Sequence, residues 1–357
     1  MPSFAVETAA QRYEAIVERG ILSRLGEFIP AGKGKVFVVS TGDVWALHGG
    51  AVEAALAAKK WHRITFPGGE ERKRLAAVEA MAEQMVEAGG DRSSLVVAFG
   101  GGIVNDLGGF LAAIFMRGVP VIQIPTTLLA QVDAAVGGKT GANLVSGKNL
   151  VGAFHQPLAV LTDPGVLDTL PEREYRAGLF EAIKHGIIRS EPLFRLMQRE
   201  PERVLAREAG AVDTMVAESV RIKSEVVSAD EREGGLRRIL NFGHTVGHAF
   251  EAETGYARFL HGEAVGLGMI AALHLSRLTG RLTAGLCGEM EAVVRSYGPF
   301  PTLEGIRAER LMARLVKDKK TIQGSVHFVL ATGIGSTEVV SGIEEPLVRE
   351  AVEASLR

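Results

Sequence analysis

Short runs of β-branched and aromatic residues recur through the first 124 residues, and this pattern constrains the fold more than any other feature of the chain. The runs are Val36–Ser40, Arg63–Phe66, Leu95–Phe99 and Pro120–Ile124. The stretches between them are long enough for helices, at about residues 43–58, 70–88 and 106–116. Strands that alternate with such helices are typical of βαβ units. The first half is therefore predicted to be an α/β domain whose parallel sheet is covered by helices on both faces.

The pattern changes after the strand-like run Leu158–Leu161 and the Asp163-Pro164 pair. Small apolar residues then follow helical spacing, which predicts helices at residues 171–190, 209–228, 237–254 and 261–279. Extended structure is expected only near 326–330 and 338–340, besides an edge strand or hairpin and a short helix within residues 1–30. We therefore expect two domains, an α/β domain at 1–164 and a mostly α-helical domain at 165–357.

The composition of the chain limits the classes of protein to which it can belong. A chain of 357 residues exceeds what one core usually supports, and its content of 46% hydrophobic and 23% charged residues is ordinary for a globular protein. The formal net charge of −2 gives no electrostatic footprint for nucleic acid or an anionic membrane. The single Cys287 excludes an internal disulfide and fits a reducing compartment. With no signal peptide and no run of eighteen apolar residues, a soluble, cytoplasmic protein is expected.

Three of the nine histidines lie close together in the predicted helical half. His244 and His248 are four residues apart, so a helix presents both on one face, and Glu251 joins them at the seventh position. His261 opens the next predicted helix. Imidazole and carboxylate groups suit zinc, and a catalytic zinc site uses three protein ligands and one open position. The density of these residues favours a metal site over isolated core or surface histidines.

Glycines stand directly beside these candidate ligands, at Gly243, Gly247 and Gly262. Glycine lowers helix propensity and allows another group to approach the backbone closely. The glycines therefore support the predicted metal site, although spacing alone does not say which group approaches them.

A glycine-rich turn, Gly100–Asp106, follows the third predicted strand and precedes a helix. Backbone N–H groups at such a helix N-terminus can bind a pyrophosphate, as a dinucleotide requires. The turn does not match the Rossmann fingerprint, because Asn105 stands where the third glycine is expected. A plain strand–helix turn is the alternative. Pro67–Glu71 ends the preceding strand, where an acid could bind a ribose hydroxyl or simply begin a helix.

Residues 125–157 are polar and rich in glycine, and we expect a long functional loop there. Lys139 and Lys148 lie in this stretch as charges that could meet phosphate. The Lys139-Thr140 pair resembles part of a P-loop, but the required glycine spacing is absent, which excludes nucleotide hydrolysis of that kind.

Glu181 and Lys184 are three residues apart in an apolar helical setting, either as a surface ion pair or as functional groups. Further cations at Arg221, Lys223, Arg237, Arg238 and in Asp318-Lys319-Lys320 could be solvated faces or could bind an anion. Taken alone, the residues predict an enzyme that uses a nucleotide and a metal ion on a small anionic substrate.

The order of these motifs resembles the 3-dehydroquinate synthase family, from about residue 36 to 335. The residues that carry the resemblance are Gly100–Asp106, Arg117-Gly118, Pro125–Asp133, Val136–Thr140, Gly147-Lys148-Asn149, Glu181–Lys184, Leu240–Thr245, Gly247-His248, His261–Val265 and Asp318-Lys319-Lys320. Asn105 departs from the family pattern, in which glycine is common.

The resemblance implies a lyase of the shikimate pathway, in aromatic amino acid biosynthesis. It would convert 3-deoxy-D-arabino-heptulosonate 7-phosphate to 3-dehydroquinate and phosphate by transient NAD oxidation, phosphate elimination, re-reduction and intramolecular aldol closure. The implied cofactors are NAD and a divalent metal, zinc or cobalt. The family is typically homodimeric, so a homodimer is expected.

The resemblance also implies roles for particular residues. The metal ligands would be Glu181, His244 and His261, which moves His248 from the metal to the substrate. Catalytic residues would be Lys184, His248, Asp133, Lys139, Asn241 and Arg237, and substrate would also contact Arg117, Asn149, Lys223, Lys319 and Lys320. NAD would contact Gly68, Gly69, Glu70, Glu71, Arg72, Lys73, Gly102, Ile103, Val104, Asn105, Asp106, Thr126, Thr127, Lys139, Lys148, Leu167, Asp168 and Thr169.

Three alternatives remain. Another sugar phosphate cyclase, making 2-deoxy-scyllo-inosose or a valiolone, would share fold and cofactors. Lys184, Asn149 and Arg237 together suit a substrate that bears a carboxylate and favour dehydroquinate synthesis. A metal-dependent NAD polyol dehydrogenase would accumulate NADH, and a non-catalytic binding protein would show no turnover with metal bound.

Overall fold

The computed structural model describes residues 2–9, 11–319 and 326–357, except for the side chains of 316–319. The chain packs as two compact units. The first comprises Met1–Pro171 and Lys223–Glu231, and the second comprises Glu172–Ile222 and Arg232–Arg357. The domain boundary expected near residue 164 stays a prediction; the packing units divide at residue 171 and return a short later segment to the first unit.

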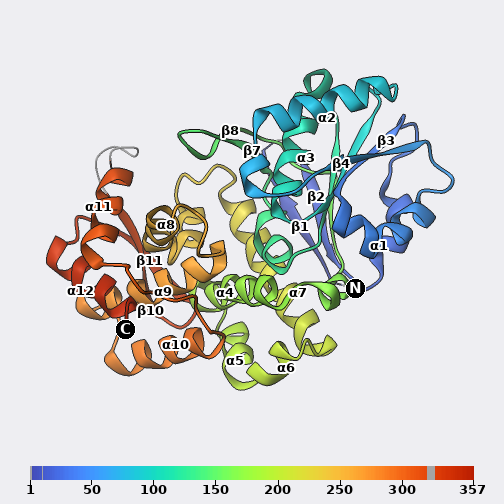
Figure 1. The fold of residues 1–357 in the computed structure, drawn as a ribbon. Coiled ribbons are helices and arrows are strands. Elements are labelled where there is room, and N and C mark those ends of the chain that lie inside the picture. Colours follow the sequence, from blue (N-terminus) through green and yellow to red (C-terminus); the bar gives the residue numbers. More distant parts are fainter. Residues whose placement is uncertain (1, 10, 320–325) are drawn as a thin grey trace. The chain divides into compact units, whose positions relative to one another are not determined.

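The first unit is built on a seven-stranded sheet in the order β1-β2-β9-β6-β5-β3-β4 (Figure 1). The strands are β1 (Ser3–Glu7), β2 (Arg12–Val17), β3 (Val36–Thr41), β4 (Trp61–Phe66), β5 (Leu95–Gly100), β6 (Val121–Pro125) and β9 (Ala159–Thr162). β1 pairs antiparallel with β2, and every other pair in this sheet is parallel. The predicted parallel sheet and the N-terminal hairpin are confirmed.

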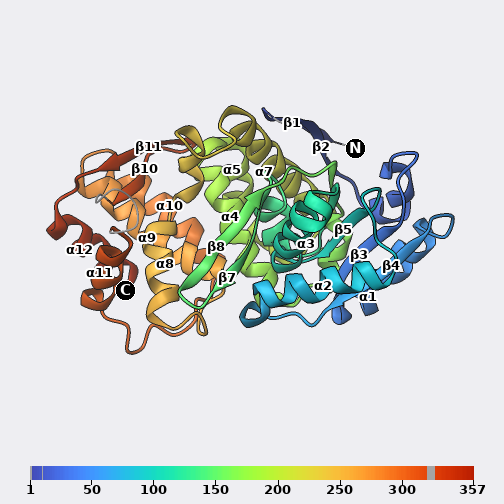
Figure 2. The same cartoon turned by 90° about the horizontal axis from the view of Figure 1, so that it is seen from above.

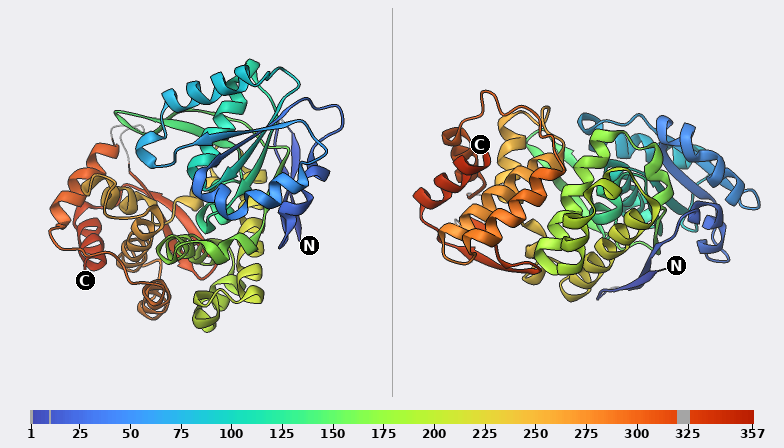
Figure 3. Two further views of the ribbon diagram at one scale, coloured as in Figure 1. Left: turned by 45° about the vertical axis from the view of Figure 1, so that its right-hand side comes forward. Right: turned by 90° about the horizontal axis from the view of Figure 1, so that it is seen from below.

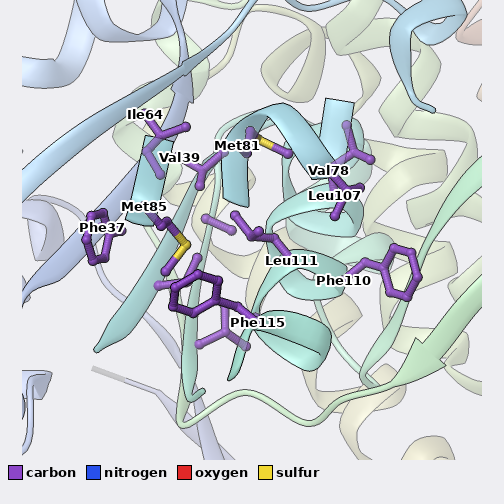
Figure 4. Close-up of a cluster of buried hydrophobic side chains, with 14 of the residues drawn as sticks. Phe37, Val39, Ile64, Val78, Met81, Met85, Leu107, Phe110, Leu111 and Phe115 are labelled. Carbon is purple, nitrogen blue, oxygen red and sulfur yellow. The ribbon is translucent and has the colours of Figure 1, made fainter. Parts of the chain in front are cut away.

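Alternate residues of the central strands enter two different hydrophobic clusters, because successive side chains of a strand point to opposite faces. Phe37 and Val39 of β3 pack in one cluster with α2 (Leu75–Glu87) and α3 (Gly102–Ile114), as Figure 4 shows. Val36 and Val38 pack in the other with α1 (Gly42–Ala55) and the 3₁₀ helix η1 (Ile21–Phe28). Helical segments therefore cover both faces of the sheet, as the continuous apolar strands predict.

The expectation of a long loop at 125–157 is wrong. The segment holds a π-helical turn η4 (Ala130–Ala134) and the strands β7 (Lys139–Leu144) and β8 (Gly147–Phe154), which pair antiparallel and lie beside α3 (Figure 2). A Cβ added at Gly152 would lie 2.0 Å from the Thr140 carbonyl oxygen. The glycines that suggested a loop thus allow two strands to approach closely, which sequence composition does not reveal.

The second unit is mostly helical, as predicted (Figures 1 and 3). Its helices are α4 (Glu172–Arg189), α5 (Glu191–Arg199), α6 (Pro201–Leu205), most of α7 (Ala209–Ala229), η6 (Leu236–Asn241), α8 (His244–Glu253), α9 (His261–Leu278), α10 (Ala284–Ser296), α11 (Ala308–Lys319) and α12 (Glu345–Ser355). The extended structure expected near 326–330 and 338–340 is present as β10 (His327–Gly333) and β11 (Ser336–Ser341), which form an antiparallel pair. Further segments η2 (Glu70–Arg72), η3 (Phe115–Arg117) and η5 (Pro164–Thr169) belong to the first unit.

The single helix expected at 237–254 is wrong, because the chain breaks between η6 and α8 at Phe242-Gly243. Gly243 has φ of 79°, a left-handed conformation that ends one helix and re-aims the next. Among the described residues, no helix has the length and apolar character needed to cross a membrane.

Candidate functional site

Three helices of the second unit bring one carboxylate and two imidazoles together. Glu181 projects from the middle of α4, and His244 and His261 are the first residues of α8 and α9. The Glu181 Oε1 atom lies 3.8 Å from His244 Nε2 and 3.6 Å from His261 Nε2. Residues far apart in the sequence therefore present three possible metal-ligand atoms to one point.

The donor set fits a divalent metal ion. Ligand atoms bound tetrahedrally at about 2.0–2.1 Å lie roughly 3.3 Å apart, close to the spacings seen here. The Glu181 side chain is fully buried, and its Oε1 atom, which faces the imidazoles, accepts no hydrogen bond among the described residues. Such a group is costly to bury unless a cation compensates it. A divalent cation among these three side chains would provide that compensation.

Lys184 occupies the other side of the same carboxylate. Its ammonium group forms an ion pair with Glu181 Oε2, and both side chains are fully buried. The two oxygens of Glu181 are thus divided between different partners: Oε1 faces the imidazoles and Oε2 faces the ammonium group. The interpretation of this pair as an exposed surface ion pair is excluded by its burial.

The two imidazoles are oriented through their Nδ1 atoms. His244 Nδ1 lies 3.2 Å from the Phe242 carbonyl oxygen, and His261 Nδ1 lies 3.3 Å from Glu251 Oε2. Such bonds fix the tautomer and leave Nε2 for a metal. Burial lowers the pKa of His261, but the hydrogen bond and charge of Glu251 outweigh it, and the net pKa is raised.

His248 belongs to a second group of possible ligands, with Glu251 and His261. Its ring centroid is 5.5 Å from that of His244 and 5.9 Å from that of His261, and its side chain is exposed. The geometry therefore admits the ligand set implied by family resemblance, and also a set of His248, Glu251 and His261. Among the described residues, no group of three close ligand atoms contains both His244 and His248, the pair suggested by their spacing. The choice of His248 as a substrate-side residue stays a prediction.

The glycines predicted to permit a close approach are contacted by neighbouring helices. A Cβ added at Gly262 of α9 would lie 1.8 Å from the Ala177 carbonyl oxygen of α4. A Cβ added at Gly268 of α9 would lie 1.9 Å from the Gly243 carbonyl oxygen at the start of α8. Because these helices touch backbone to backbone, the helix starts that carry His261 and His244 are brought to Glu181.

In the first unit, the predicted nucleotide-binding turn follows β5 and opens α3. Thr126 and Thr127 follow the adjacent strand β6, and the Thr126 N–H donates to the Gly100 carbonyl oxygen at 2.9 Å. The carboxyl ends of neighbouring parallel strands are the usual ligand-binding edge of an α/β sheet. Asn105 is buried and its amide donates to the Ala98 carbonyl oxygen at 3.1 Å, so its side chain is engaged with β5.

A polar network joins several of the residues predicted to contact NAD. The buried Lys73 ammonium group pairs with Asp106 and donates to Asn149 Oδ1 at 2.6 Å. Asn143 donates to Glu70 Oε1 at 2.7 Å and accepts from the Asn149 backbone N–H at 2.8 Å. Burial raises the pKa of Asp106 against the opposing charge of Lys73. Asn149, which is expected to contact the substrate, thus hydrogen-bonds with Lys73 and Asn143, in the same network as residues that are expected to contact NAD.

The remaining predicted cofactor residues of the first unit lie in turns or at element ends. Gly68 and Gly69 have φ of 77° and 91°. Glu71 and Arg72 are exposed, Lys139 is exposed at the start of β7, and Lys148 is half-buried in β8. In η5, Leu167 is buried, Asp168 lies 3.8 Å from an Arg19 nitrogen, and Thr169 Oγ1 lies 2.8 Å from His48 Nε2. Gly102, Ile103 and Val104 form the first turn of α3.

Predicted substrate residues fall in both units, and each unit is described separately. In the first, Asp133 forms an ion pair with Lys223, and Arg117 is exposed with φ of 71° directly after Met116 with φ of 50°. Two consecutive left-handed non-glycine residues are a strained arrangement, of a kind that clusters at functional sites.

In the second unit, Arg237 is buried, and the Asn241 amide donates to Glu233 Oε1 at 2.6 Å. Lys320 lies outside the described residues, and the side chain of Lys319 is not described.

Sequence reasoning missed the orienting role of Glu251 and the bridging role of Asn143. The spacing of Glu251 from His244 places both on one helix face and indicates only a possible ligand. The contact between His261 Nδ1 and the Glu251 carboxylate depends on how α8 and α9 cross, and the spacing of residues along the sequence does not specify this crossing. Asn143 belongs to no recognised sequence motif. The feature that marks it, an amide buried within the glycine-rich hairpin, becomes visible in the structure.

Solved structures share the two-part fold. The 2-epi-5-epi-valiolone synthase of Streptomyces hygroscopicus subsp. jinggangensis, solved with NAD+ and Zn2+ bound, is 29% identical over 96% of both chains with a TM-score of 0.87. A 2-deoxy-scyllo-inosose synthase solved with carbaglucose-6-phosphate, NAD+ and Co2+ is 24% identical over 98% of this chain and 99% of that chain, with a TM-score of 0.89. The fold is thus that of the sugar phosphate cyclases.

Sequence comparison then identifies the family. The 3-dehydroquinate synthase N-terminal model matches residues 63–177 and the C-terminal model matches residues 178–321. A 3-dehydroquinate synthase of Solibacter usitatus is 64% identical over 100% of both chains. One of Koribacter versatilis is 45% identical over 98% of this chain and 96% of that relative. The chain belongs to the 3-dehydroquinate synthase family.

Proposed function

We propose that this chain converts 3-deoxy-D-arabino-heptulosonate 7-phosphate to 3-dehydroquinate and phosphate. The observation that carries the proposal is the convergence of Glu181, His244 and His261 beside Lys184, in a chain that belongs to this family along its length. The ligand atoms and the buried ammonium group supply what elimination of a phosphate from an oxidised sugar acid needs: a metal-binding position and a fixed positive charge.

NAD and a divalent metal, zinc or cobalt, are the cofactors. Two of the cyclases of this fold were solved with NAD+ and with Zn2+ or Co2+. When bound, NAD supplies a reversible hydride acceptor for the substrate's C5 alcohol, and the metal supplies a Lewis acid for the oxygen on that carbon. Within the chain, Glu181, His244 and His261 would hold the metal, and Glu251 would hold His261 in the required orientation.

The positive charge of Lys184 would stabilise the departing phosphate and the other negative charges of the substrate. Its ammonium group is fully buried and fixed by Glu181, so it needs little reorganisation as negative charge develops. The side chain of Arg237 is also buried, and its guanidinium group would bind a carboxylate of the substrate. Asn241 would position the substrate beside them, and the exposed His248 would exchange protons with substrate or water.

The first unit would bind NAD at the carboxyl edge of its sheet. N–H groups at the start of α3 would meet the pyrophosphate, and Glu70, held by Asn143, would accept from a ribose hydroxyl. Lys139 and Lys148 would contribute positive charge, and Thr126, Thr127, Leu167, Asp168 and Thr169 would complete the cofactor contacts. Asp133, Lys223, Arg117 and Asn149 are the substrate residues proposed in this unit.

We also infer a homodimer that acts in the cytoplasm on a small sugar phosphate, with no nucleic acid or membrane partner. The balanced charge of the chain supports a small-molecule role, and family membership supports dimerisation. Sedimentation of the purified protein tests the dimer, since a single species of monomer mass would contradict it.

The second candidate function is that of another sugar phosphate cyclase, because the valiolone synthase shares this fold at 29% identity. The 64% identity with a 3-dehydroquinate synthase over the full chain favours dehydroquinate synthesis. Dehydrogenases of related fold are more distant, for example an NADH-dependent butanol dehydrogenase of Thermotoga maritima at 16% identity over 99% of this chain and 100% of that chain, with a TM-score of 0.70. That likeness concerns the fold alone.

The test is release of phosphate from 3-deoxy-D-arabino-heptulosonate 7-phosphate, with NADH absorbance followed in the same sample. We expect many turnovers without net NADH, and loss of turnover with a chelator or in His261→Ala. Net NADH would indicate a dehydrogenase. No phosphate release from enzyme loaded with metal and NAD would contradict the proposal, and glucose 6-phosphate and sedoheptulose 7-phosphate would then distinguish the other cyclases.

A further inference from the structure

A third group of possible metal ligands lies between α9 and α10, outside the residues assigned above. It consists of His274 on α9 with Cys287 and Glu291 on α10. His274 Nε2 lies 2.8 Å from Glu291 Oε2, and the possible ligand atoms of all three residues lie within 4.8 Å of one another. Cys287 and Glu291 are four residues apart and therefore share one face of α10. The two helices, both orange in Figure 3, pack against each other.

This group is separate from the first metal centre. His261 opens α9 and His274 lies in its last turns, about 20 Å further along a helix that rises about 1.5 Å per residue. The two groups share no side chain. Their chemistry also differs, because the first contains imidazole and carboxylate groups, and the second contains the one cysteine of the chain.

We propose that His274, Cys287 and Glu291 form a second site, which binds a thiophilic divalent cation such as zinc. Thiolate, imidazole and carboxylate are the three donor types that zinc takes in proteins, and a water molecule would complete a tetrahedron. Ligand atoms in such a tetrahedron lie roughly 3.3–3.7 Å apart. The His274–Glu291 pair would therefore open by about 0.5 Å, which rotation of two partly exposed side chains allows.

The charges around the group leave one carboxylate oxygen for a cation. Arg295 occupies Glu291 Oε1 at 2.7 Å, and Oε2 faces His274. The charge of Arg277 acts on the Cys287 thiol and opposes the rise in its pKa. Cys287 itself is buried, while His274 and Glu291 have side chains that are 20% and 19% exposed and provide a path for entry.

Binding would replace the thiol proton. The cation joins the sulfur as a thiolate and one proton passes to solvent, so no oxidant or reductant is needed. Burial and the Glu291 carboxylate raise the pKa of the Cys287 thiol, and binding should therefore strengthen as pH rises. A cation held by both helices would also stabilise the second unit, because it binds the folded chain and not the unfolded one.

Cobalt(II) tests the site directly. Thiolate-to-cobalt charge transfer gives a near-ultraviolet absorption band, and Cys287 is the one possible source of it in this chain. The full-length protein would be freed of metal with a chelator, loaded with NAD and titrated with cobalt(II). We expect a saturable band that reaches one thiolate-bound cobalt per chain, disappears in Cys287→Ser and is displaced by zinc.

His274→Ala and Glu291→Gln should each weaken cobalt binding at this band at least tenfold. Glu289→Gln is the matched control, because Glu289 lies on the same helix but pairs with Arg195, and it should leave the band unchanged. Absence of the band with cobalt in excess would overturn the proposal. So would a band that persists unchanged in both His274→Ala and Glu291→Gln, because the thiol alone would then bind the metal. These two variants, at partly exposed positions, keep the test valid if Cys287→Ser fails to fold.

Discussion

The candidate residues of the first unit follow the ends of parallel strands, whereas those of the second come from three crossing helices. In the first unit, the sheet itself gathers Gly100, Thr126 and their neighbours at one edge. In the second, Glu181, His244 and His261 meet because glycines let α4, α8 and α9 touch. The same chain thus assembles one candidate site from backbone topology and the other from close helix packing.

The two regions also differ in how their polar groups are satisfied. Lys73, Asp106, Asn149, Asn143 and Glu70 hydrogen-bond or pair with one another. The carboxylate of Glu181 instead directs one buried oxygen at two imidazoles. The groups of the first arrangement pair with one another, whereas Glu181 Oε1, on the side away from Lys184, would gain its compensation from a bound cation. We therefore expect substitutions in the second unit to have the larger effects.

The largest effect should follow His261→Ala. Loss of this imidazole should release the metal and lower turnover on the order of 10³-fold, because a Lewis acid contributes several kcal/mol to such a reaction. His248→Ala is the matched comparison, and it should retain full metal content. Metal analysis with steady-state kinetics checks both variants. Loss of metal from His248→Ala with retention in His261→Ala would reverse the assignment.

Lys184→Ala should lower turnover roughly 10²–10³-fold, the scale of a lost electrostatic contact to a developing charge. Metal and NAD should remain bound. The metal-free variant should also be less stable by about 3–5 kcal/mol, because a buried partner of Glu181 is removed. Zinc should restore part of that loss. Kinetics and urea unfolding with and without zinc measure these effects, and unchanged turnover would remove Lys184 from the site.

Gly262→Ala tests whether helix contact builds the metal centre. The added methyl group would collide with the Ala177 carbonyl oxygen, so we expect about 1–3 kcal/mol lower stability and weaker zinc binding. Gly288→Ala in α10 is the control, because its added methyl group meets open space and should raise stability by roughly 0.5–1 kcal/mol. Equal thermal shifts in the two variants would contradict the packing account.

Glu251→Ala should weaken zinc binding about 10–100-fold, the usual cost of losing an orienting partner of a metal-bound histidine. Glu251→Gln should lie closer to the unmodified protein, because its amide oxygen can still accept from His261 Nδ1. A competition titration against a chromogenic chelator gives both dissociation constants. If the two variants bind zinc as tightly as the unmodified protein, Glu251 does not orient the ligand.

The smallest effect is expected in the first unit. Asn149→Ala removes one hydrogen bond from Lys73, which keeps its ion pair with Asp106, so stability should fall by only about 1 kcal/mol. The exposed neighbour Leu150→Ala should change it less. Urea unfolding of the ligand-free protein distinguishes them. A loss of several kcal/mol in Asn149→Ala would show that the network is not self-sufficient.

The strands were predictable because a buried β-branched run such as Val36–Ser40 has the same signature whatever packs on it. The hairpin of β7 and β8 was not, since Gly141 and Gly152 indicate a loop unless their facing strand is known. Spacing alone grouped His244, His248, Glu251 and His261 as candidate ligands and did not include Glu181, which lies on a different helix far earlier in the chain. Only family resemblance proposed Glu181, because the crossing of α4 and α9 has no local signature.

The most direct test of the metal centre is the anomalous scattering of zinc in crystals of the metal-loaded protein. We expect a peak bounded by Glu181 Oε1, His244 Nε2 and His261 Nε2, with Glu251 on the far side of the His261 ring, whether or not a second peak lies at His274, Cys287 and Glu291. A peak bounded instead by His248, Glu251 and His261, with Glu181 still paired to Lys184 alone, would contradict it.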